Sequence, residues 1–195
     1  MSDMRRAGES GLEAEQLPEN DGVRLLLEQH EKLRALFEEV STSEPDRKAR
    51  AFEELWMRLA AHGTAEQEVL RPMTRGAAGQ EVVDARNHEE QEAFEELIAL
   101  EELGVASEEF DTAFAAFRSS VEQHFRNEET EEFPRIVRRS DETHRVELGR
   151  RLRHAEAHVE ADPDEAVEDL AAGRERRGPV AALAERIREA LRRRH

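Results

Sequence analysis

The chain has 195 residues, a formal net charge of −17, and neither cysteine nor tyrosine. This charge argues against a general nucleic-acid binder, because phosphate contacts need clustered Lys and Arg, and against docking on an anionic membrane surface. The lack of cysteine excludes disulfides, thiolate catalysis, iron–sulfur clusters and cysteine-ligated zinc. The sequence contains no run of about 18 apolar residues, so it predicts no membrane span. We expect a cytoplasmic protein.

The composition predicts an all-α fold. Ala, Leu, Glu and Arg dominate the sequence, and all four are good helix formers. Apolar residues make up only 37% of the chain, and charged residues 38%. The core should therefore be narrow, as it is between helices that each carry one apolar stripe.

The predicted elements follow in chain order. Residues 1–20 are polar and without periodicity, so we expect a disordered segment. Apolar residues at helical spacing predict four helices, over about 21–40, 46–71, 80–103 and 107–132. Pro134 should stop or kink the fourth helix. Four helices joined by short loops predict an up-down-up-down bundle over residues 21–138.

The remaining residues, 139–195, are predicted to form a C-terminal helical extension. A fifth helix is expected over 141–160, followed by a linker and by a last amphipathic helix that begins at Gly178-Pro179. That last helix could pack on its own bundle, form a homodimer or bind a partner. Packing on the bundle is the simplest of the three.

Two segments share an unusual arrangement. HGTAEQEVLRP (62–72) and HFRNEETEEFP (124–134) each contain a His, a Glu four residues later and a Pro six residues after that Glu. On a helix, positions i and i+4 share a face, so His62 with Glu66, and His124 with Glu128, could each reach one metal ion. In so acidic a chain, the pairs alone are weak evidence.

Their register strengthens the case. His30 and both His–Glu pairs continue the apolar stripes of their helices, where buried carboxylates need partners such as a metal ion. The predicted loops lie midway between His30 and His62, between Glu66 and His88, and between His88 and His124. This places the four histidines within about one helical turn of a common plane. His88 is the weakest of these candidates, because the apolar residues of its helix cluster on the opposite side.

The chain also looks internally duplicated. HEKLRALF (30–37) parallels HEEQEAFE (88–95), and a His–Glu–Pro segment follows each. Such a repeat predicts a pseudo-two-fold site in which two carboxylates bridge two metal ions and imidazoles act as terminal ligands. Imidazole and carboxylate ligands without sulfur suit iron or manganese.

With these motifs, residues 20–138 resemble the hemerythrin-like family, specifically its HHE cation-binding domain. The matching residues, in order, are His30, His62 with Glu66, His88, and His124 with Glu128, followed by the pair Phe133-Pro134. The resemblance implies a centre of two iron ions, bridged by carboxylates and an oxo or hydroxo group, inside a four-helix bundle. In oxygen-carrying members a second His follows four residues after the one on the third helix. Glu92 stands there in this sequence, which argues against reversible oxygen carriage and leaves open whether Glu92 is a ligand.

The leading hypothesis is a di-iron protein that binds or processes a small oxidant, namely oxygen, peroxide or nitric oxide. Whether it is an enzyme stays open. One alternative is an iron- or oxygen-responsive sensor that acts through the C-terminal helix. Another is a bundle that has lost its metal, although the carboxylates at core positions would then be left unpaired.

Overall fold

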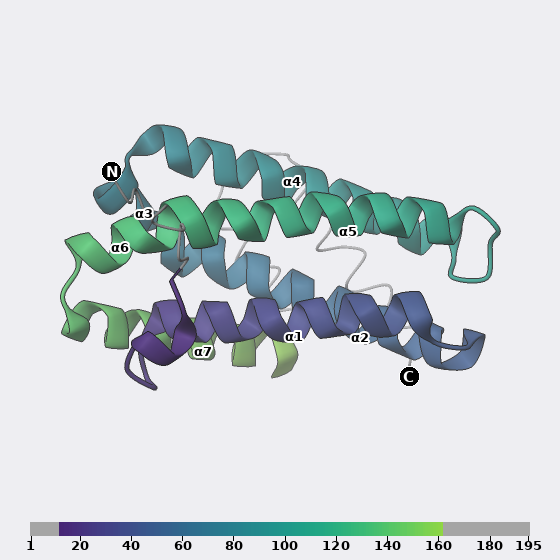
Figure 1. Cartoon of the computed structure of the whole chain (residues 1–195), viewed down its shortest axis with the longest axis horizontal. Coiled ribbons are helices and arrows are strands. Elements are labelled where there is room, and N and C mark those ends of the chain that lie inside the picture. The colour runs from purple at the N-terminus through teal and green to yellow at the C-terminus, as the bar shows by residue number, and fades with distance from the viewer. Residues whose placement is uncertain (1–11, 162–195) are drawn as a thin grey trace, which may run out of the picture.

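The computed structural model describes residues 12–161, and every regular element in that range is a helix. Four long helices run back and forth along the molecule (Figure 1): α1 (Gly22–Thr42), α2 (Pro45–Ala65), α4 (Gln80–Leu103) and α5 (Phe110–Asn127). The predicted all-α, up-down-up-down bundle is confirmed. The shorter elements are η1 (Ala14–Gln16), η2 (Glu66–Leu70), α3 (Arg71–Ala78), η3 (Glu128–Glu132) and α6 (Phe133–Arg139), and α7 (Glu142–Ala161) follows them.

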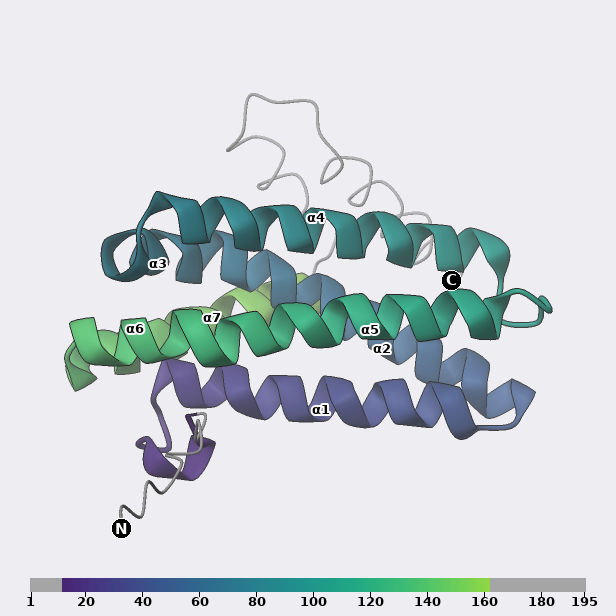
Figure 2. The same cartoon turned by 45° about the horizontal axis from the view of Figure 1, so that its top comes forward.

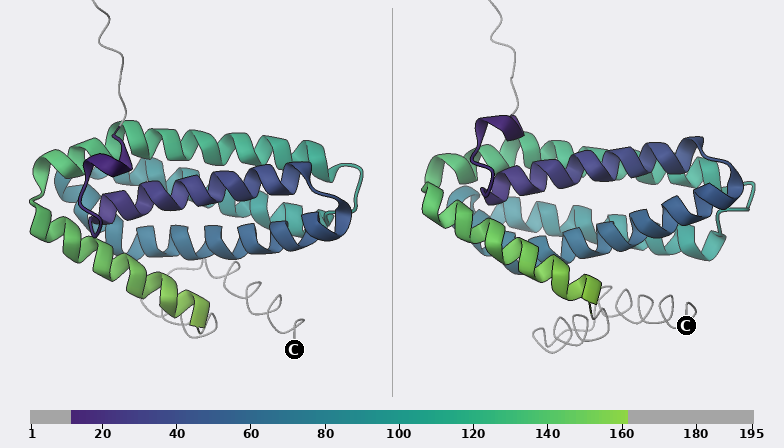
Figure 3. Two further views of the ribbon diagram at one scale, coloured as in Figure 1. Left: turned by 60° about the horizontal axis from the view of Figure 1, so that its bottom comes forward. Right: turned by 90° about the horizontal axis from the view of Figure 1, so that it is seen from below.

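The helices pair in chain order. α1 packs against α2 and α4 against α5, and contacts of α1 with α5 and of α2 with α4 close the bundle (Figure 2). α7 lies outside the four long helices and crosses α1 and α2 obliquely (Figure 3). It begins one residue after the start of the predicted fifth helix.

A polar contact joins the beginning of α1 to α7. The Asp21 carboxylate accepts a hydrogen bond from the backbone N–H of Val23 at 2.9 Å, which caps the helix. The other Asp21 oxygen accepts from Nε of Arg145, on α7, at 2.6 Å. Close to this pair, Gly149 packs directly on the chain before α1, because a Cβ added there would lie 2.7 Å from the carbonyl oxygen of Asn20.

The structure differs from the sequence prediction at the N-terminal side of the bundle. The disordered segment was expected over residues 1–20, but residues 12–20 are described, and Leu17 is buried against the same apolar cluster as Val23 and Leu148. This apolar contact anchors a segment whose polar composition had suggested disorder. The predicted linker after residue 161 and the predicted last helix lie outside the described residues, as do residues 1–11.

Pro134 was predicted to stop or kink the fourth helix, and the chain does not stop there, because a π-helical turn and a further helix follow α5. η2 and η3 are π-helical turns, and the chain continues from them without a break into α3 and α6. Pro72 and Pro134 each lie in the first turn of the new α-helical segment, a position that proline favours. The helical path therefore passes both prolines.

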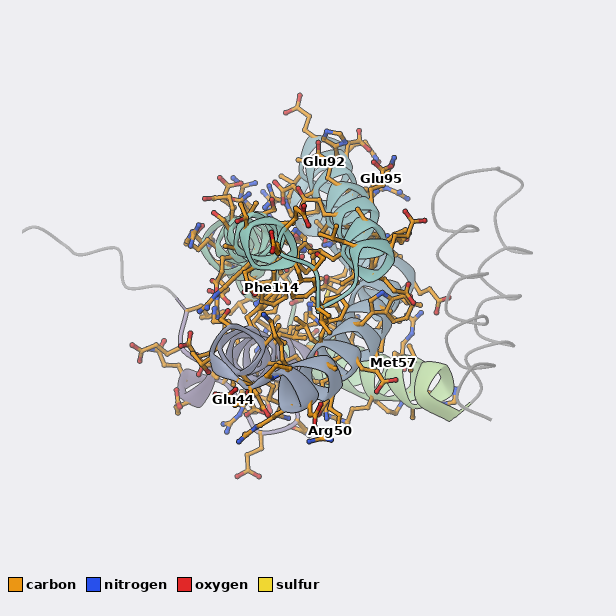
Figure 4. All side chains as sticks on the ribbon, turned by 90° about the vertical axis from the view of Figure 1, so that its right-hand side faces the viewer. Glu44, Arg50, Met57, Glu92, Glu95 and Phe114 are labelled. Carbon is orange, nitrogen blue, oxygen red and sulfur yellow. The ribbon has the colours of Figure 1, made fainter. Side chains whose placement is uncertain are left out.

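The core consists of two apolar clusters. The larger cluster contains Phe37, Leu55, Trp56, Phe110, Phe114 and Phe117, and the smaller one contains Val23, Leu26, Leu70, Phe133, Ile136 and Leu152. In an end-on view, Phe114 points between the helices while Glu92 and Glu95 of α4 point outward (Figure 4). On α1 the smaller cluster ends at Leu27 and the larger begins at Leu33, with buried His30 between them. A buried polar layer thus separates the clusters.

Among residues 12–161, no helix combines the length and the apolar character needed to cross a membrane.

Candidate metal centre

Six buried side chains from six helical elements face one another in the polar layer. They are His30 of α1, His62 of α2, Glu66 of η2, Glu90 of α4, His124 of α5 and Glu128 of η3, and none is more than 6% exposed. Their ligand atoms form two groups, each lying within 4.8 Å. The first position comprises His30, His62, Glu66 and Glu128, and the second comprises Glu66, Glu90, His124 and Glu128. The two positions therefore share two carboxylates.

The shared carboxylates present one oxygen to each position. Oε1 of Glu66 lies 3.5 Å from Nε2 of His62, while its Oε2 lies 3.9 Å from Nε2 of His124. Oε2 of Glu128 lies 3.3 Å from Nε2 of His30, while its Oε1 lies 3.5 Å from Nε2 of His124. This division of oxygens is the one required of carboxylates that bridge two metal ions.

The first position has the chemistry of a cation site. All four atoms that face it, namely Nε2 of His30, Nε2 of His62, Oε1 of Glu66 and Oε2 of Glu128, are buried without a hydrogen-bond partner. Each such group costs roughly 1–3 kcal/mol when it is left unpaired. One metal ion would satisfy all four, and a nitrogen and oxygen set without sulfur suits iron or manganese. The residues present therefore fit the metal that the sequence implied.

Each histidine is oriented by a contact on its outer nitrogen. Nδ1 of His30 lies 2.7 Å from Oε1 of Glu129. Nδ1 of His62 lies 3.0 Å from Oε1 of Gln29, and Nδ1 of His124 lies 3.0 Å from Oε2 of Glu89. An Nδ1–H that donates to these oxygens leaves Nε2 directed at the centre, where it offers a lone pair once the imidazole is neutral. Such outer contacts commonly orient metal-binding imidazoles.

The histidines differ in protonation. Burial, helped by the nearby charge of His30, lowers the pKa of His62 well below its ordinary value, so its imidazole is neutral as a metal requires. Burial also disfavours the charged form of His124, but the Glu128 and Glu66 carboxylates outweigh it and hold the pKa of His124 well above its ordinary value. Metal binding at the second position must therefore displace a proton.

Equivalent contacts reveal the register of the internal repeat. Gln29 contacts His62, and Glu89 makes the same contact with His124. One residue further along, His30 contacts Glu129 on η3, and Glu90 accepts a hydrogen bond of 2.8 Å from Nε2 of Gln67 on η2. The counterpart of His30 on α4 is therefore Glu90.

His88 was predicted to be a ligand, and this prediction is wrong. Its side chain is 70% exposed and lies 3.4 Å from the exposed carboxylate of Glu92. The buried residues of α4, among them Val83, Phe94 and Leu97, form a stripe that includes Glu90. His88 precedes Glu90 by two residues, or about 200° around the helix, and so points to solvent. The structure brings the other five predicted ligands together.

The family model for the Hemerythrin HHE cation binding domain matches residues 21–136. This chain belongs to that family. Membership implies metal binding, commonly of iron, and agrees with the two groups of candidate ligands.

A solved structure has the same fold. It is a hemerythrin HHE cation binding domain-containing protein from Mycobacterium kansasii, with a TM-score of 0.64 and 18% sequence identity, over 84% of this chain and 98% of that one. At this identity the likeness shows the fold alone. No curated protein sequence matches the chain.

In this HHE domain, Arg71 is buried beside the second position, a placement that its sequence did not predict. Its Nη2 donates to Oε1 of Glu128 at 2.9 Å and forms an ion pair with Glu90, and its Nη1 donates to Glu132 at 2.7 Å. The π-helical turn brings it there, because the backbone N–H of Arg71 bonds to the carbonyl of Glu66, five residues earlier. A signal was present in the repeat, where Arg71-Pro72 stands opposite Phe133-Pro134.

Glu132 adds a fourth buried carboxylate to the surroundings of the two positions, beside Glu66, Glu90 and Glu128. It accepts hydrogen bonds from Arg71 and from the hydroxyl of Thr74. Burial raises the pKa of Glu132 to about 7, and the nearby Arg71 charge only partly opposes this. Glu132 therefore holds a proton over much of the range below neutral pH.

An apolar cavity of about 30 Å³ adjoins the second position. Its walls include Leu59, Phe94 and Phe117, and its polar lining consists of His62, Glu66, Glu90 and His124. One water-sized molecule needs roughly 10–15 Å³, so the cavity suits a molecule of two or three atoms.

Proposed function

We propose that this HHE domain binds two iron ions, one at each position, and that a small oxidant reaches them from the adjoining cavity. The observation that carries the proposal is the set of four unpartnered ligand atoms at the first position. Glu90 takes the part that the sequence analysis gave to His88. Dioxygen, peroxide and nitric oxide are all small enough for the cavity.

The chain's residues then have distinct roles. His30 and His62 hold the first metal, and His124 and Glu90 hold the second. Glu66 and Glu128, each of which presents one oxygen to each position, would be shared by both metals. The metals would supply redox chemistry and an open coordination position for the oxidant.

The apolar walls determine what can approach. Leu59, Phe94 and Phe117 surround the ligands with hydrocarbon, which admits small molecules and keeps out larger polar ones. Enlarging Ala93, which also lines the cavity, should therefore slow the reaction with peroxide while leaving the iron content unchanged. Equal rates for Ala93→Leu and the unaltered protein would argue against access through this cavity.

Metal analysis and an absorption spectrum test the proposal directly. The purified or reconstituted protein should contain close to two irons per chain and show near-ultraviolet charge-transfer bands that change on adding peroxide or nitric oxide. Glu90→Gln should lower the iron content, whereas His88→Ala, on the outer face of the same helix, should leave it unchanged. A protein that takes up no iron under reducing, anaerobic conditions would overturn the proposal.

A further inference from the structure

Arg71 places a positive charge against the second position. Its Nη2 lies 2.9 Å from Oε1 of Glu128 and 3.6 Å from Oε2 of Glu66, and these are the two oxygens that face His124. The same nitrogen forms an ion pair with Glu90. All three carboxylates of the second position therefore already have a cationic partner supplied by the protein.

Arg71 donates no hydrogen bond to the oxygens that face the first position, which instead lie 3.3 Å from Nε2 of His30 and 3.5 Å from Nε2 of His62. Oε1 of Glu66 and Oε2 of Glu128, which face this position, lack hydrogen bonds, and so do the facing nitrogens of His30 and His62. The two positions share their bridging carboxylates but not their charge environment. The first is open to a cation, and the second is partly neutralised.

The difference in charge between the two positions comes from one residue that differs between the repeated halves. Phe133 is the counterpart of Arg71, since each donates its backbone N–H to the first residue of a π-helical turn and each precedes a proline. The Phe133 ring lies 5.6 Å from the ring of His30, whereas Arg71 pairs with Glu90. An aromatic pair in one half is thus replaced by an ion pair in the other.

We propose that Arg71 makes the two metal positions unequal, so that the first binds its metal tightly and the second binds at least about tenfold more weakly. This inference rests on the proposed function. A divalent cation at the second position must share Oε1 of Glu128 with the guanidinium, and like charges a few ångströms apart repel strongly away from water. Glu90 must also release Arg71 before it can coordinate a metal.

Arg71 has a matching effect when the second position lacks a metal. It forms ion pairs with the carboxylates of Glu66, Glu90 and Glu128. Without a partner, buried charges of this kind would destabilise the folded protein. A protein loaded only at the first position is then a stable state. The two metals should enter in sequence, with the half-loaded form accumulating between them.

Anaerobic calorimetric titration of the metal-free protein with Fe²⁺ tests this order. The unaltered protein should show one tight step and one step at least about tenfold weaker. Arg71→Met removes the charge at similar length and should tighten the weak step by about tenfold or more, so that the steps converge. Arg71→Lys keeps a charge and should keep the steps apart.

Two further variants assign the steps. Glu90→Gln should weaken only the second step, because Glu90 belongs to the second position alone, and His30→Asn should weaken the first. If Arg71→Met does not fold, the double variant Arg71→Met/Glu132→Gln takes its place in the titration. It should fold more readily, because it also removes one of the carboxylates that Arg71 contacts. Arg145→Met removes another buried arginine, on α7, and controls for destabilisation of the fold by the loss of a buried charge. It should leave both binding steps unchanged.

The outcomes separate the two proposals. Two unequal steps that converge in Arg71→Met support the inference. Two equal steps in the unaltered protein, or unequal steps that Arg71→Met leaves apart, overturn it while iron binding stands. A protein that binds no Fe²⁺ overturns the proposed function, and the inference with it.

Discussion

Glu90 and His30 occupy equivalent places in the two halves of the bundle. Each follows a residue that contacts Nδ1 of a histidine on the neighbouring helix, and each contacts the residue after a glutamate that both positions share. The positions correspond in space but differ in chemistry, because one offers an imidazole and the other a carboxylate. Two metals bound here would have different ligands, and we expect their spectra to differ.

Glu66→Gln should have opposite effects in the metal-free and metal-bound proteins. Both Glu66 oxygens are buried without a hydrogen-bond partner, and the ion pair with Arg71 reaches only one of them, at 3.6 Å, so removing the charge should stabilise the metal-free protein by about 1–3 kcal/mol. The same change removes a carboxylate that both positions share and should reduce iron retention. Urea unfolding with and without chelator measures both effects.

Glu68→Gln is the matched control, since Glu68 lies two residues away and is exposed. It should change stability by no more than about 0.5 kcal/mol and leave the iron content unchanged. A destabilised Glu66→Gln protein that keeps its iron would show that Glu66 has a structural role instead.

Metal binding should release protons and weaken as the pH falls. The Glu128 and Glu66 carboxylates hold the pKa of His124 well above its ordinary value despite burial, yet only the neutral imidazole binds metal. Affinity at the second position should drop by about tenfold per pH unit below that pKa if one proton is released. Calorimetry in two buffers of different ionisation enthalpy counts the protons.

Glu89→Gln provides a comparison for this proton release. Glu89 contacts Nδ1 of His124 at 3.0 Å and helps to raise its pKa. The variant should release fewer protons on binding iron. An unchanged proton count would mean that another group supplies the proton.

Glu132 should make the metal-free protein less stable as the pH rises. Its pKa of about 7 in the folded protein exceeds the ordinary value of 4.5, because of its burial, so between these values the folded chain holds a proton that the unfolded chain has lost. Stability then falls with increasing pH over this range, by the sign of proton linkage. Glu132→Gln should remove the loss, so its advantage over the unaltered protein should grow from about pH 5 to about pH 8 in urea unfolding.

The neighbouring exposed residue allows a direct comparison. Glu131→Gln makes the same chemical change one position earlier, on the surface of the π-helical turn. It should leave the pH dependence of unfolding unchanged. If Glu132→Gln also leaves it unchanged, Glu132 does not hold the extra proton.

Gly149→Ala should destabilise the docking of α7. The added Cβ would lie 2.7 Å from the Asn20 carbonyl oxygen and 3.1 Å from the Gly22 nitrogen, and backbone atoms cannot move aside easily. We expect a loss of about 1–3 kcal/mol in the free energy of unfolding, with iron binding retained. Gly76→Ala, on α3, meets nothing within 4 Å and should gain roughly 0.5–1 kcal/mol. Equal stabilities for the two variants would contradict this close contact.

Apolar periodicity was enough to predict the four long helices and most of the centre. His30, His62 and His124 interrupt regular stripes of Leu, Val and Phe, so their burial could be inferred from spacing alone. On α4 the same reasoning gave the wrong ligand. Its apolar stripe passes through Glu90. His88, two residues away, was predicted instead, because histidine is a common metal ligand and HEKLRALF is similar to HEEQEAFE.

Arg71 and the π-helical turns could not be inferred in this way. Extrapolation at 100° per residue places Arg71 about 140° from Glu66, away from the site. In the structure, the wider turn returns Arg71 to the face of Glu66, because the backbone hydrogen bond spans five residues. A local change of helical type, which apolar spacing does not encode, therefore decided which charged residue reached the metal position.

The two π-helical turns also bear on how such a centre could arise or disappear. Each holds one residue more than an α-helical turn needs. Deleting one residue from η2 would let α2 and α3 join as a continuous α-helix and would rotate everything after the turn by about 100°. Arg71 would leave the carboxylates, and the buried face of α3 would turn from its contacts with α4 and α6. One extra residue in each π-helical turn therefore decides whether the residues that follow it face the centre.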